Sequence, residues 1–238
     1  MTVNKYKGTI NVFKKSDYVD LALINGIVTV INGHTVLQVS KNFYDSFLSG
    51  KAPCFPAIVA ESIHLRYQNK KLSENSLDSC FKIDPFIKDI KGLEAFKVSK
   101  SPLSLNCDDK FANCFFWNAN GKVAGACFNS TYVDMITEFS HEINCTGEKS
   151  PAYFENDSTF VAILPINNAD LKELIKSMNA EIELRKTISQ LQRDKSELER
   201  ALYNYKEVDR CEIIKGNFKK GLITMSECVE SLKDEILA

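Results

Sequence analysis

The sequence predicts an α+β protein with a β-rich N-terminal domain, a long coiled-coil helix and a short helical tail. Residues 167–215 contain neither proline nor glycine, and apolar residues recur within them at alternating spacings of four and three. That spacing is typical of a helix that packs against a partner helix. The residues before this run instead contain β-branched segments separated by turn residues. We therefore divide the chain into residues 1–168, 169–208 and 209–238.

The composition is that of an ordinary globular protein. Hydrophobic residues make up 44% of the chain, enough for a packed core, and charged residues make up 26%. There are 17 basic and 17 acidic residues up to Asn168, and 13 and 14 beyond it. Neither part is a basic arm, which counts against strong electrostatic binding of DNA and leaves only a local patch open.

The cysteines and the N-terminus indicate a cytoplasmic protein. Residues 1–15 are polar and lack the apolar segment of a signal peptide, and no stretch approaches the roughly 18 apolar residues of a membrane span. The eight cysteines never form a CxxC pair, and several lie in apolar runs. We expect reduced core residues rather than disulfides or a metal site.

The clearest local pattern of the N-terminal domain is a β-hairpin. Residues 27–31 and 34–39 are rich in β-branched side chains and flank Asn32–Gly33, a dipeptide that fits a type I′ turn. The segments expected next are a short helix at 42–48, a β-rich run at 57–67 and a polar loop at 69–79.

A second set of the same parts lies about 88 positions later. Residues 114–128 form another predicted hairpin, and a short helix follows with Asn129 or Ser130 as its N-cap. Two further strands are expected within residues 150–165. Residues 26–67 and 114–166 therefore predict an internal repeat, with the chance recurrence of hairpin–helix units as the alternative.

Residues 121–136 read Gly-Lys-Val-Ala-Gly-Ala-Cys-Phe-Asn-Ser-Thr-Tyr-Val-Asp-Met-Ile and resemble the last domain of bacterial β sliding clamps. In those proteins a strand runs into a Phe-Asn-x-x-Tyr helix start. Residues 150–152 stand where the clamp has a Pro-leading strand, and residues 160–166 stand where the clamp chain ends on a Met-Pro strand. The resemblance covers residues 121–166 and implies domains of two βαβββ units, in a replication or phage-type setting.

Two departures from the clamp pattern bear on function. Clamp helices line a DNA-facing hole and should be basic, yet residues 129–142 carry Asp134, Glu138 and Glu142 and no lysine or arginine. The clamp chain should also stop near Pro165, whereas this chain continues into the long helix. Two interpretations therefore remain: a working clamp, and a clamp-like fold that serves a different function.

The long helix, residues 170–208, would span about 58 Å. Its early apolar positions run out of phase with the later ones, so we expect a stutter near residues 178–184. A polar Lys195 at an a position can specify register or oligomer number, and we expect a dimer ahead of a trimer. The alternative is a helix that packs on its own domain. The predicted oligomer interface is Leu184, Ile188, Leu191, Lys195, Leu198, Leu202 and Tyr205.

The tail begins after the helix and contains a capping box. Thr224 and Glu227 have the Thr-x-x-Glu spacing in which each side chain satisfies the backbone N–H of the other. A helix through Ile236 follows. Residues 209–238 resemble the short C-terminal element called SHOCT, which implies oligomerisation or docking to a partner. An ordinary helical hairpin is the alternative.

No motif predicts catalysis. The chain has no GxxxxGK[ST] loop, GxSxG elbow or HExxH helix, and His34, His64 and His141 are far apart. We expect His64 to be a core histidine with satisfied hydrogen bonds, Asp108–Asp109 to be a solvated turn rather than a metal site, and residues 115–117 to be a core strand rather than a base-stacking platform. No catalytic, cofactor-binding or metal-binding residue is assigned.

The function predicted from the sequence is that of a non-enzymatic, self-associating binding or scaffold protein, clamp-like in fold. The expected partners are a second copy and another protein, with DNA left open but unsupported by charge, and no membrane. One alternative is an oligomeric interaction module, an inhibitor or adaptor, without DNA binding. The other is a small enzyme with a site dispersed in the N-terminal domain.

Overall fold

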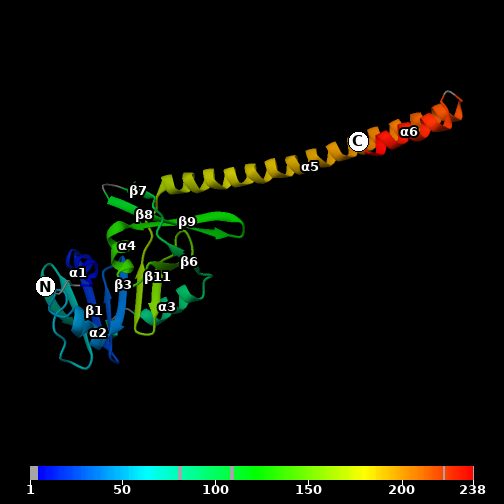
Figure 1. Cartoon of the computed structure of the whole chain (residues 1–238). Coiled ribbons are helices and arrows are strands. Elements are labelled where there is room, and N and C mark those ends of the chain that lie inside the picture. The colour runs from blue at the N-terminus through cyan, green and yellow to red at the C-terminus, as the bar shows by residue number, and fades with distance from the viewer. Residues whose placement is uncertain (1–4, 80–81, 108–109, 222, 238) are drawn as a thin grey trace. The chain divides into compact units, whose positions relative to one another are not determined.

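The computed structural model describes residues 5–79, 82–107, 110–221 and 223–237. The chain falls into two compact units that divide after Asn179 (Figure 1). The first unit contains two β-sheets with helices and the start of a long helix. The second contains the rest of that helix and a short final helix. The expected α+β class is therefore confirmed.

Helices and strands are interspersed along the chain. The helices of the described residues are α1 (Lys7–Lys14), α2 (Lys41–Phe47), the 3-10 helix η1 (Leu77–Ser79), α3 (Ile83–Lys91), α4 (Ser130–Thr137), α5 (Ala169–Lys219) and α6 (Met225–Leu237). The strands are β1 (Tyr18–Ile24), β2 (Ile27–Ile31), β3 (Thr35–Ser40), β4 (Ile63–Gln68), β5 (Lys71–Asn75), β6 (Phe96–Ser99), β7 (Ser104–Cys107), β8 (Lys110–Ala119), β9 (Lys122–Asn129), β10 (Glu142–Cys145), β11 (Ala152–Asn156) and β12 (Thr159–Ile163).

The larger sheet has nine antiparallel strands in the order β5-β4-β1-β2-β3-β12-β11-β10-β6. Its centre is the pairing of β3 with β12, in which Val36 lies opposite Ala162. This pairing brings together the two segments that were expected to be repeats. The smaller sheet is the antiparallel meander β7-β8-β9. The two expected repeat hairpins thus lie in different sheets, although each leads directly into a short helix.

Two of the hairpin turns have an Asn-Gly pair in the left-handed backbone conformation. Asn25–Gly26 joins β1 to β2 with φ of 52° and 76°, and Asn120–Gly121 joins β8 to β9 with φ of 53° and 79°; positive φ at both positions fits type I′. At Asn32–Gly33 only the glycine has positive φ, so the type I′ turn expected there is wrong. Asn32 is buried instead, and its Oδ1 accepts hydrogen bonds from N (2.9 Å) and Oγ1 (2.8 Å) of Thr35.

Alternating side chains of the nine-stranded sheet enter two cores. On β12, Val161 and Ile163 join the main core, whereas Phe160 and Ala162 face the opposite side. The main core lies beneath α1, α2 and α4, and the opposite side is covered by α3. The largest fully buried side chains of the main core include Phe13, Tyr44, Phe55, Phe115, Phe128 and Met135.

Two short helices begin on capped residues at the ends of strands. The Ser40 Oγ accepts a hydrogen bond from Phe43 N (3.2 Å) at the start of α2. The Asn129 Oδ1 accepts one from Thr131 N (2.9 Å) at the start of α4, which confirms one of the two expected N-caps. Each strand therefore passes into its helix without a loop.

Helix α1 is tied to α4 by a carboxylate. The Glu138 side chain follows the end of α4 and accepts hydrogen bonds from Gly8 N (2.5 Å), Thr9 N (2.9 Å) and Thr9 Oγ1 (2.7 Å). These donors lie at the N-terminus of α1, where backbone N–H groups have no partner within the helix and a negative charge is favoured. A carboxylate 130 positions away in the sequence thus holds α1 in place.

Three stretches differ from expectation. Residues 7–14 form α1, in which Ile10, Val12 and Phe13 are buried, although no element was expected there. The expected polar loop at 69–79 is wrong, because it contains β5 and η1. Helix α5 continues to Lys219, past the residue where the long helix was expected to end.

Candidate interaction site on the long helix

The first turns of α5 are bound to the small sheet. The Asn168 Oδ1 accepts a hydrogen bond from Leu171 N (2.9 Å), and Leu171 (5% exposed) and Ile175 (9%) pack on the outer face of β8 and β9. One turn further, Asn179 accepts from Val123 N (2.7 Å) and donates to Val123 O (2.8 Å). The amide thus pairs with the edge of β9 as a neighbouring strand would. Three consecutive turns therefore form the base of α5, which we define as residues 168–179.

This contact gives a physical reason for the phase change in the sequence. Leu171, Ile175 and Asn179, which contact β8 and β9, recur at a spacing of four. The phase change expected near residues 178–184 coincides with the point where the first compact unit ends. Helix α5 is continuous through it.

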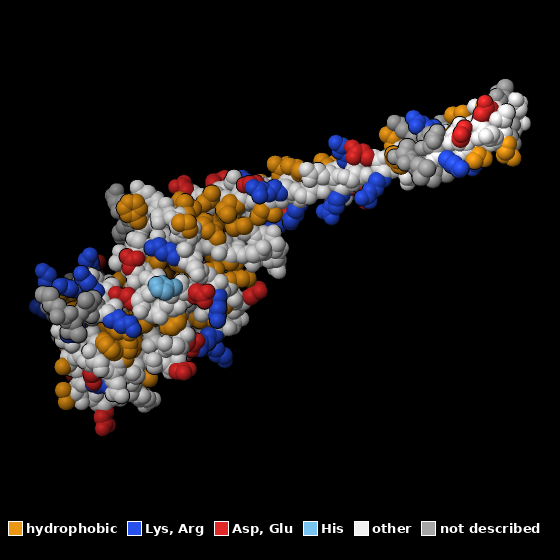
Figure 2. All heavy atoms as spheres, in the orientation of Figure 1, with side chains coloured by type: hydrophobic (Ala, Val, Ile, Leu, Met, Phe, Trp, Pro, Cys, Tyr) orange, Lys and Arg blue, Asp and Glu red, His pale blue; other side chains and the backbone are white. Residues whose placement is uncertain are grey.

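Beyond its base, α5 presents the predicted interface residues to solvent. Leu184 is 60% exposed, Ile188 45%, Leu191 60%, Leu198 71% and Leu202 54%. Figure 2 shows hydrophobic side chains along this helix among charged ones. The side chain of Tyr205 lies outside the described part. We call the five exposed residues with Lys195 the α5 stripe.

Charged side chains flank the α5 stripe. The Lys195 side chain is 76% exposed, and its Nζ lies 3.7 Å from Glu199 Oε1. Arg185 pairs with Glu181 at 2.6 Å in the same i, i+4 arrangement. Exposed pairs of this kind contribute about 0.2–0.5 kcal/mol each to helix stability. They stabilise α5 as a helix but do not determine what it binds.

The final helix begins as the capping box predicts. Thr224 N and Oγ1 donate to Glu227 Oε2 at 2.7 and 2.9 Å, and Glu227 N donates to Thr224 Oγ1 at 3.3 Å. The hydrogen bonds from the Thr224 backbone and side chain lower the pKa of the Glu227 carboxyl below its ordinary value. Cys228 is 6% exposed, so the start of α6 also has a buried side. The SHOCT resemblance of residues 209–238 stays a prediction.

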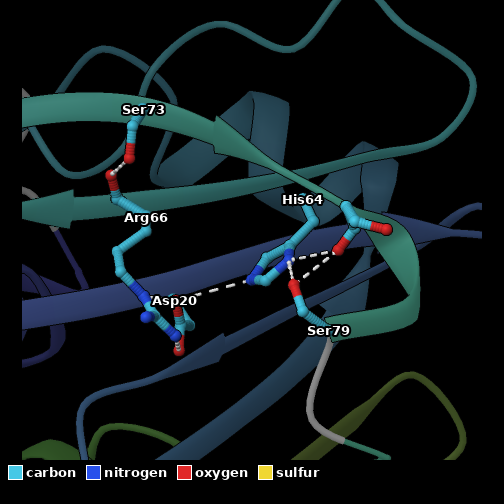
Figure 3. Close-up of polar contacts among 6 residues, drawn as sticks. Asp20, His64, Arg66, Ser73 and Ser79 are labelled. Atoms are coloured by element: carbon cyan, nitrogen blue, oxygen red, sulfur yellow. Dashed lines mark hydrogen bonds and ion pairs between the residues drawn. The ribbon is translucent and has the colours of Figure 1, made fainter.

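A cluster around His64 is the arrangement that most resembles catalytic chemistry (Figure 3). His64 is 1% exposed on β4, and its Nδ1 lies 3.0 Å from Ser76 O and 3.2 Å from Ser79 Oγ. Its Nε2 lies 3.4 Å from Asp20 Oδ1, within ion-pair distance but without hydrogen-bond geometry. The His64 ring thus lies between the side chains of a serine and an aspartate, as the histidine of a hydrolase triad does.

The hydrogen bonds of this cluster argue against that chemistry. The Ser79 hydroxyl donates to Ser76 O at 2.7 Å, so its proton points away from the imidazole. Arg66 donates to both carboxylate oxygens of Asp20 at 2.7 and 2.8 Å, which compensates the charge that a triad directs at histidine. The cluster therefore ties β1, β4 and η1 together, and His64 lies in the core as expected. The expectation that its hydrogen bonds are satisfied is wrong, because the buried Nε2 has no hydrogen-bond partner among the described residues.

The remaining candidates from the sequence lie in three different settings. Phe115 and Trp117 are buried in the main core, and Phe116 packs on the opposite face toward the base of α5, so they form a core strand. Asp108–Asp109 lie outside the described residues. His34 is exposed and stacks on Tyr132, with ring centroids 5.8 Å apart, at a surface pocket of about 640 Å³.

Among the described residues, no three His, Cys, Asp or Glu side chains are grouped to hold a metal ion. None of the described helices has both the length and the apolar character needed to cross a bilayer.

Sequence reasoning missed two contacts that position α5. Asn179 is a polar residue inside a helix and carries no pattern that predicts its pairing with β9. Gly125 on β9 leaves room for the ring of Phe116, its directly opposite neighbour on β8, because a Cβ at position 125 would lie 2.8 Å from that ring. A glycine inside a strand is the pattern that could have predicted such a close approach.

Comparisons with known proteins give a fold resemblance. No family model and no curated protein matches the chain. Solved structures that match include DNA polymerase III beta subunits from Pseudomonas aeruginosa (TM-score 0.32, 12% identity, 70% of this chain and 66% of that one) and Streptococcus pyogenes (0.30, 9%, 70% and 64%). A putative beta subunit from Eubacterium rectale also matches (0.28, 12%, 69% and 64%).

The chain therefore spans less than two thirds of the length of these structures. The resemblance to bacterial sliding clamps that residues 121–166 suggested is confirmed as a resemblance.

Proposed function

We propose that the chain is a non-enzymatic, self-associating binding protein in which the α5 stripe joins two copies as a short coiled coil. The observation that carries this proposal is the exposure of five leucine and isoleucine side chains, each 45–71% exposed, at heptad spacing along one helix. Isolated apolar side chains are normal on a protein surface, but a periodic stripe is typical of an interface.

The spacing favours another helix over a globular surface. Two apolar residues per heptad form a seam narrower than the stripe with which a helix covers a broad core. The base of α5 is already occupied by β8 and β9, so the stripe begins where that packing stops. A second copy of the same helix supplies the matching seam.

Lys195 supports a defined register. It takes the a position between Leu191 and Leu198, and in the same heptads Asp194 and Glu199 lie beside the seam. In a pair of helices these carboxylates compensate the two lysine charges only when the Lys195 residues lie at matching heights. The proposal therefore includes a dimer in one register.

The first unit is proposed to bind a protein partner. Its candidate DNA-facing helix, α4, carries exposed Asp134 and no basic residue, and the whole chain has 30 basic and 31 acidic residues. Counterion release, which drives binding to DNA, requires basic side chains on the contact surface. Titration with double-stranded DNA at decreasing salt is expected to show negligible binding; salt-dependent association would favour a clamp-like use instead.

The test of self-association replaces two residues of the α5 stripe. A Leu191→Gln, Leu198→Gln variant of the full chain keeps good helix formers and leaves the net charge unchanged. Sedimentation velocity across a micromolar concentration series should show association of the original chain and a monomeric variant.

The matched control places glutamine on another face of the same heptads. Ser189→Gln with Ser196→Gln introduces the same residue at exposed b positions and should associate as the original chain does. Equal association of all three proteins would contradict the coiled coil. Circular dichroism of each protein checks that α5 remains helical.

A further inference from the structure

A pair of cysteines lies beneath the base of α5. Cys114 on β8 and Cys127 on β9 are directly opposite in the antiparallel register, and both are fully buried. They share one small core with Ala112, Leu171 and Ile175. This core is separate from the main one, because Phe115 and Ala126, the adjacent opposite pair, face the other side of the sheet.

The backbone hydrogen bonds determine what kind of pair this is. Cys114 donates to Leu103 O (3.2 Å) and accepts from Ser101 N (3.1 Å), while Cys127 accepts from Ile166 N (2.8 Å). The backbone polar groups of both cysteines therefore point away from each other, which makes them a non-hydrogen-bonded pair. In such pairs the Cα atoms are about 4.5 Å apart, and the side chains approach most closely.

That spacing matches disulfide geometry. Disulfides span Cα separations of about 4.4–6.8 Å, so the two strands need not move apart or together to accommodate the bond. We propose that Cys114 and Cys127 form a dithiol site that oxidises to a cross-strand disulfide, and that the base of α5 controls access of the oxidant to it.

The reaction balances with hydrogen peroxide as the oxidant. One thiolate sulfur attacks a peroxide oxygen, the O–O bond breaks, and a sulfenic acid and hydroxide form; the hydroxide becomes water by taking up the proton that the thiol lost. The second sulfur then attacks the sulfenic sulfur, the S–O bond breaks, and a second water leaves with the remaining proton. The two sulfurs together lose two electrons, and the peroxide gains them.

The base of α5 is the structural gate. Leu171 and Ile175 cover the cysteine face of β8 and β9, while the Cys127 thiol donates to Ile166 O (3.3 Å) in the segment that leads into α5. An oxidant reaches the sulfurs only when these turns lift. Oxidation also removes the Cys127 donor, so the site links the redox state of the sheet to the attachment of the long helix.

Buried cysteines elsewhere provide internal references. Burial raises the pKa of the Cys54 thiol to about 11 and of the Cys145 thiol to about 12, which keeps both protonated at neutral pH. Neither is opposite another cysteine in the described strand pairings. Because neither has a cysteine opposite it with which to form a disulfide, they should not appear in a cross-linked peptide while the proposed pair reacts.

The test treats the full chain with hydrogen peroxide and maps peptides by mass spectrometry without reduction. The expected product is a Cys114–Cys127 cross-linked peptide that has lost two hydrogens. Leu171→Ala should form it at least about tenfold faster, because truncating a buried leucine weakens the cover. Lys172→Ala, an exposed position in the same turn, should react at the original rate.

Three results would overturn the proposal. One is absence of the cross-link in both the original chain and Leu171→Ala at excess peroxide. Another is joining of either cysteine to a different one. The third is an equal rate of cross-linking in Leu171→Ala and Lys172→Ala, which would show that the base of α5 does not control access of the oxidant. If Leu171→Ala fails to fold, Ile175→Val loosens the same cover by one methyl group and is judged by the same rates.

Discussion

The carboxylate of Glu138 offers a quantitative test of how the first unit is held together. It accepts three hydrogen bonds at the N-terminus of α1 from Gly8 and Thr9. Replacing it by alanine leaves two partly buried backbone donors without their partner, at about 1–3 kcal/mol each, and removes a favourable charge–dipole interaction of about 0.3–1 kcal/mol. Since the donors are only partly buried, water recovers some of this loss. We expect Glu138→Ala to lower the free energy of unfolding by about 2–4 kcal/mol.

Urea unfolding followed by circular dichroism measures this effect. With an m value of about 2 kcal/mol/M, the midpoint should fall by about 1–2 M. Asp134→Ala is the control on the same helix, since its side chain is 68% exposed and its nearest cation, Lys100 Nζ, is 3.9 Å away. Exposed pairs contribute about 0–1 kcal/mol, so this midpoint should move little. Equal midpoint shifts for both variants would show that the Glu138 carboxylate does not hold α1 in place.

Gly8 provides a second arm of the same experiment. A Cβ at position 8 would lie 2.9 Å from Glu138 Oε1, so Gly8→Ala should destabilise the chain even though alanine favours helix. In the Glu138→Ala background that contact is gone, and Gly8→Ala should become neutral or stabilising by up to about 1 kcal/mol. A destabilisation that is the same in both backgrounds would show that the contact does not act through the carboxylate.

Three further outcomes are expected. Lys195→Leu should tighten self-association by at least about tenfold, because burying a leucine contributes about 1.5–3 kcal/mol; an unchanged dissociation constant in sedimentation would place Lys195 outside the seam. Gly125→Ala should cost about 1–3 kcal/mol in urea unfolding, since its Cβ would meet Phe116 Cδ1 at 2.8 Å and Phe115 O at 2.9 Å, and an unchanged midpoint would count against this packing. Because the folded pKa of Glu227 is lowered, the capping contribution is present above the ordinary glutamate pKa and is lost as pH falls through the lowered value; NMR titration should show this, and Thr224→Ala should return the pKa to its ordinary range.

Local patterns in the sequence were sufficient for several elements. The Asn120–Gly121 turn, the strands on either side and the Asn129 cap lie close together in the chain, and their chemistry is set by neighbours a few positions away. The same is true of the Thr224–Glu227 capping box. These elements could be placed without knowing the rest of the fold.

Elements held by distant contacts could not be placed in this way. Helix α1 has eight residues, and its N-terminus is capped by Glu138, 130 positions from Gly8. Strand β5 carries a mixed polar sequence and pairs with β4 at the edge of the sheet, where alternation is weak. The local sequence of β5 contains too little alternation to predict a strand on its own, whereas α1 is amphipathic but only eight residues long, which is short for a helix prediction from periodicity.

The candidate site shows the same division. The heptad spacing predicted the α5 stripe, because that pattern is written along one helix. The base of α5 could not be predicted, since Leu171, Ile175 and Asn179 are recognised by strands some 50 residues earlier, Asn179 by Val123 at a separation of 56. The pairing of Cys114 with Cys127 likewise depends on the register of a hairpin.

Sedimentation equilibrium of the unaltered full chain measures directly whether the α5 stripe joins two copies. At concentrations through the micromolar range, a coiled-coil dimer should give a reversible rise in mass from the 26.8 kDa of a single chain to twice that value. A mass that stays at 26.8 kDa throughout this range would contradict self-association through the α5 stripe.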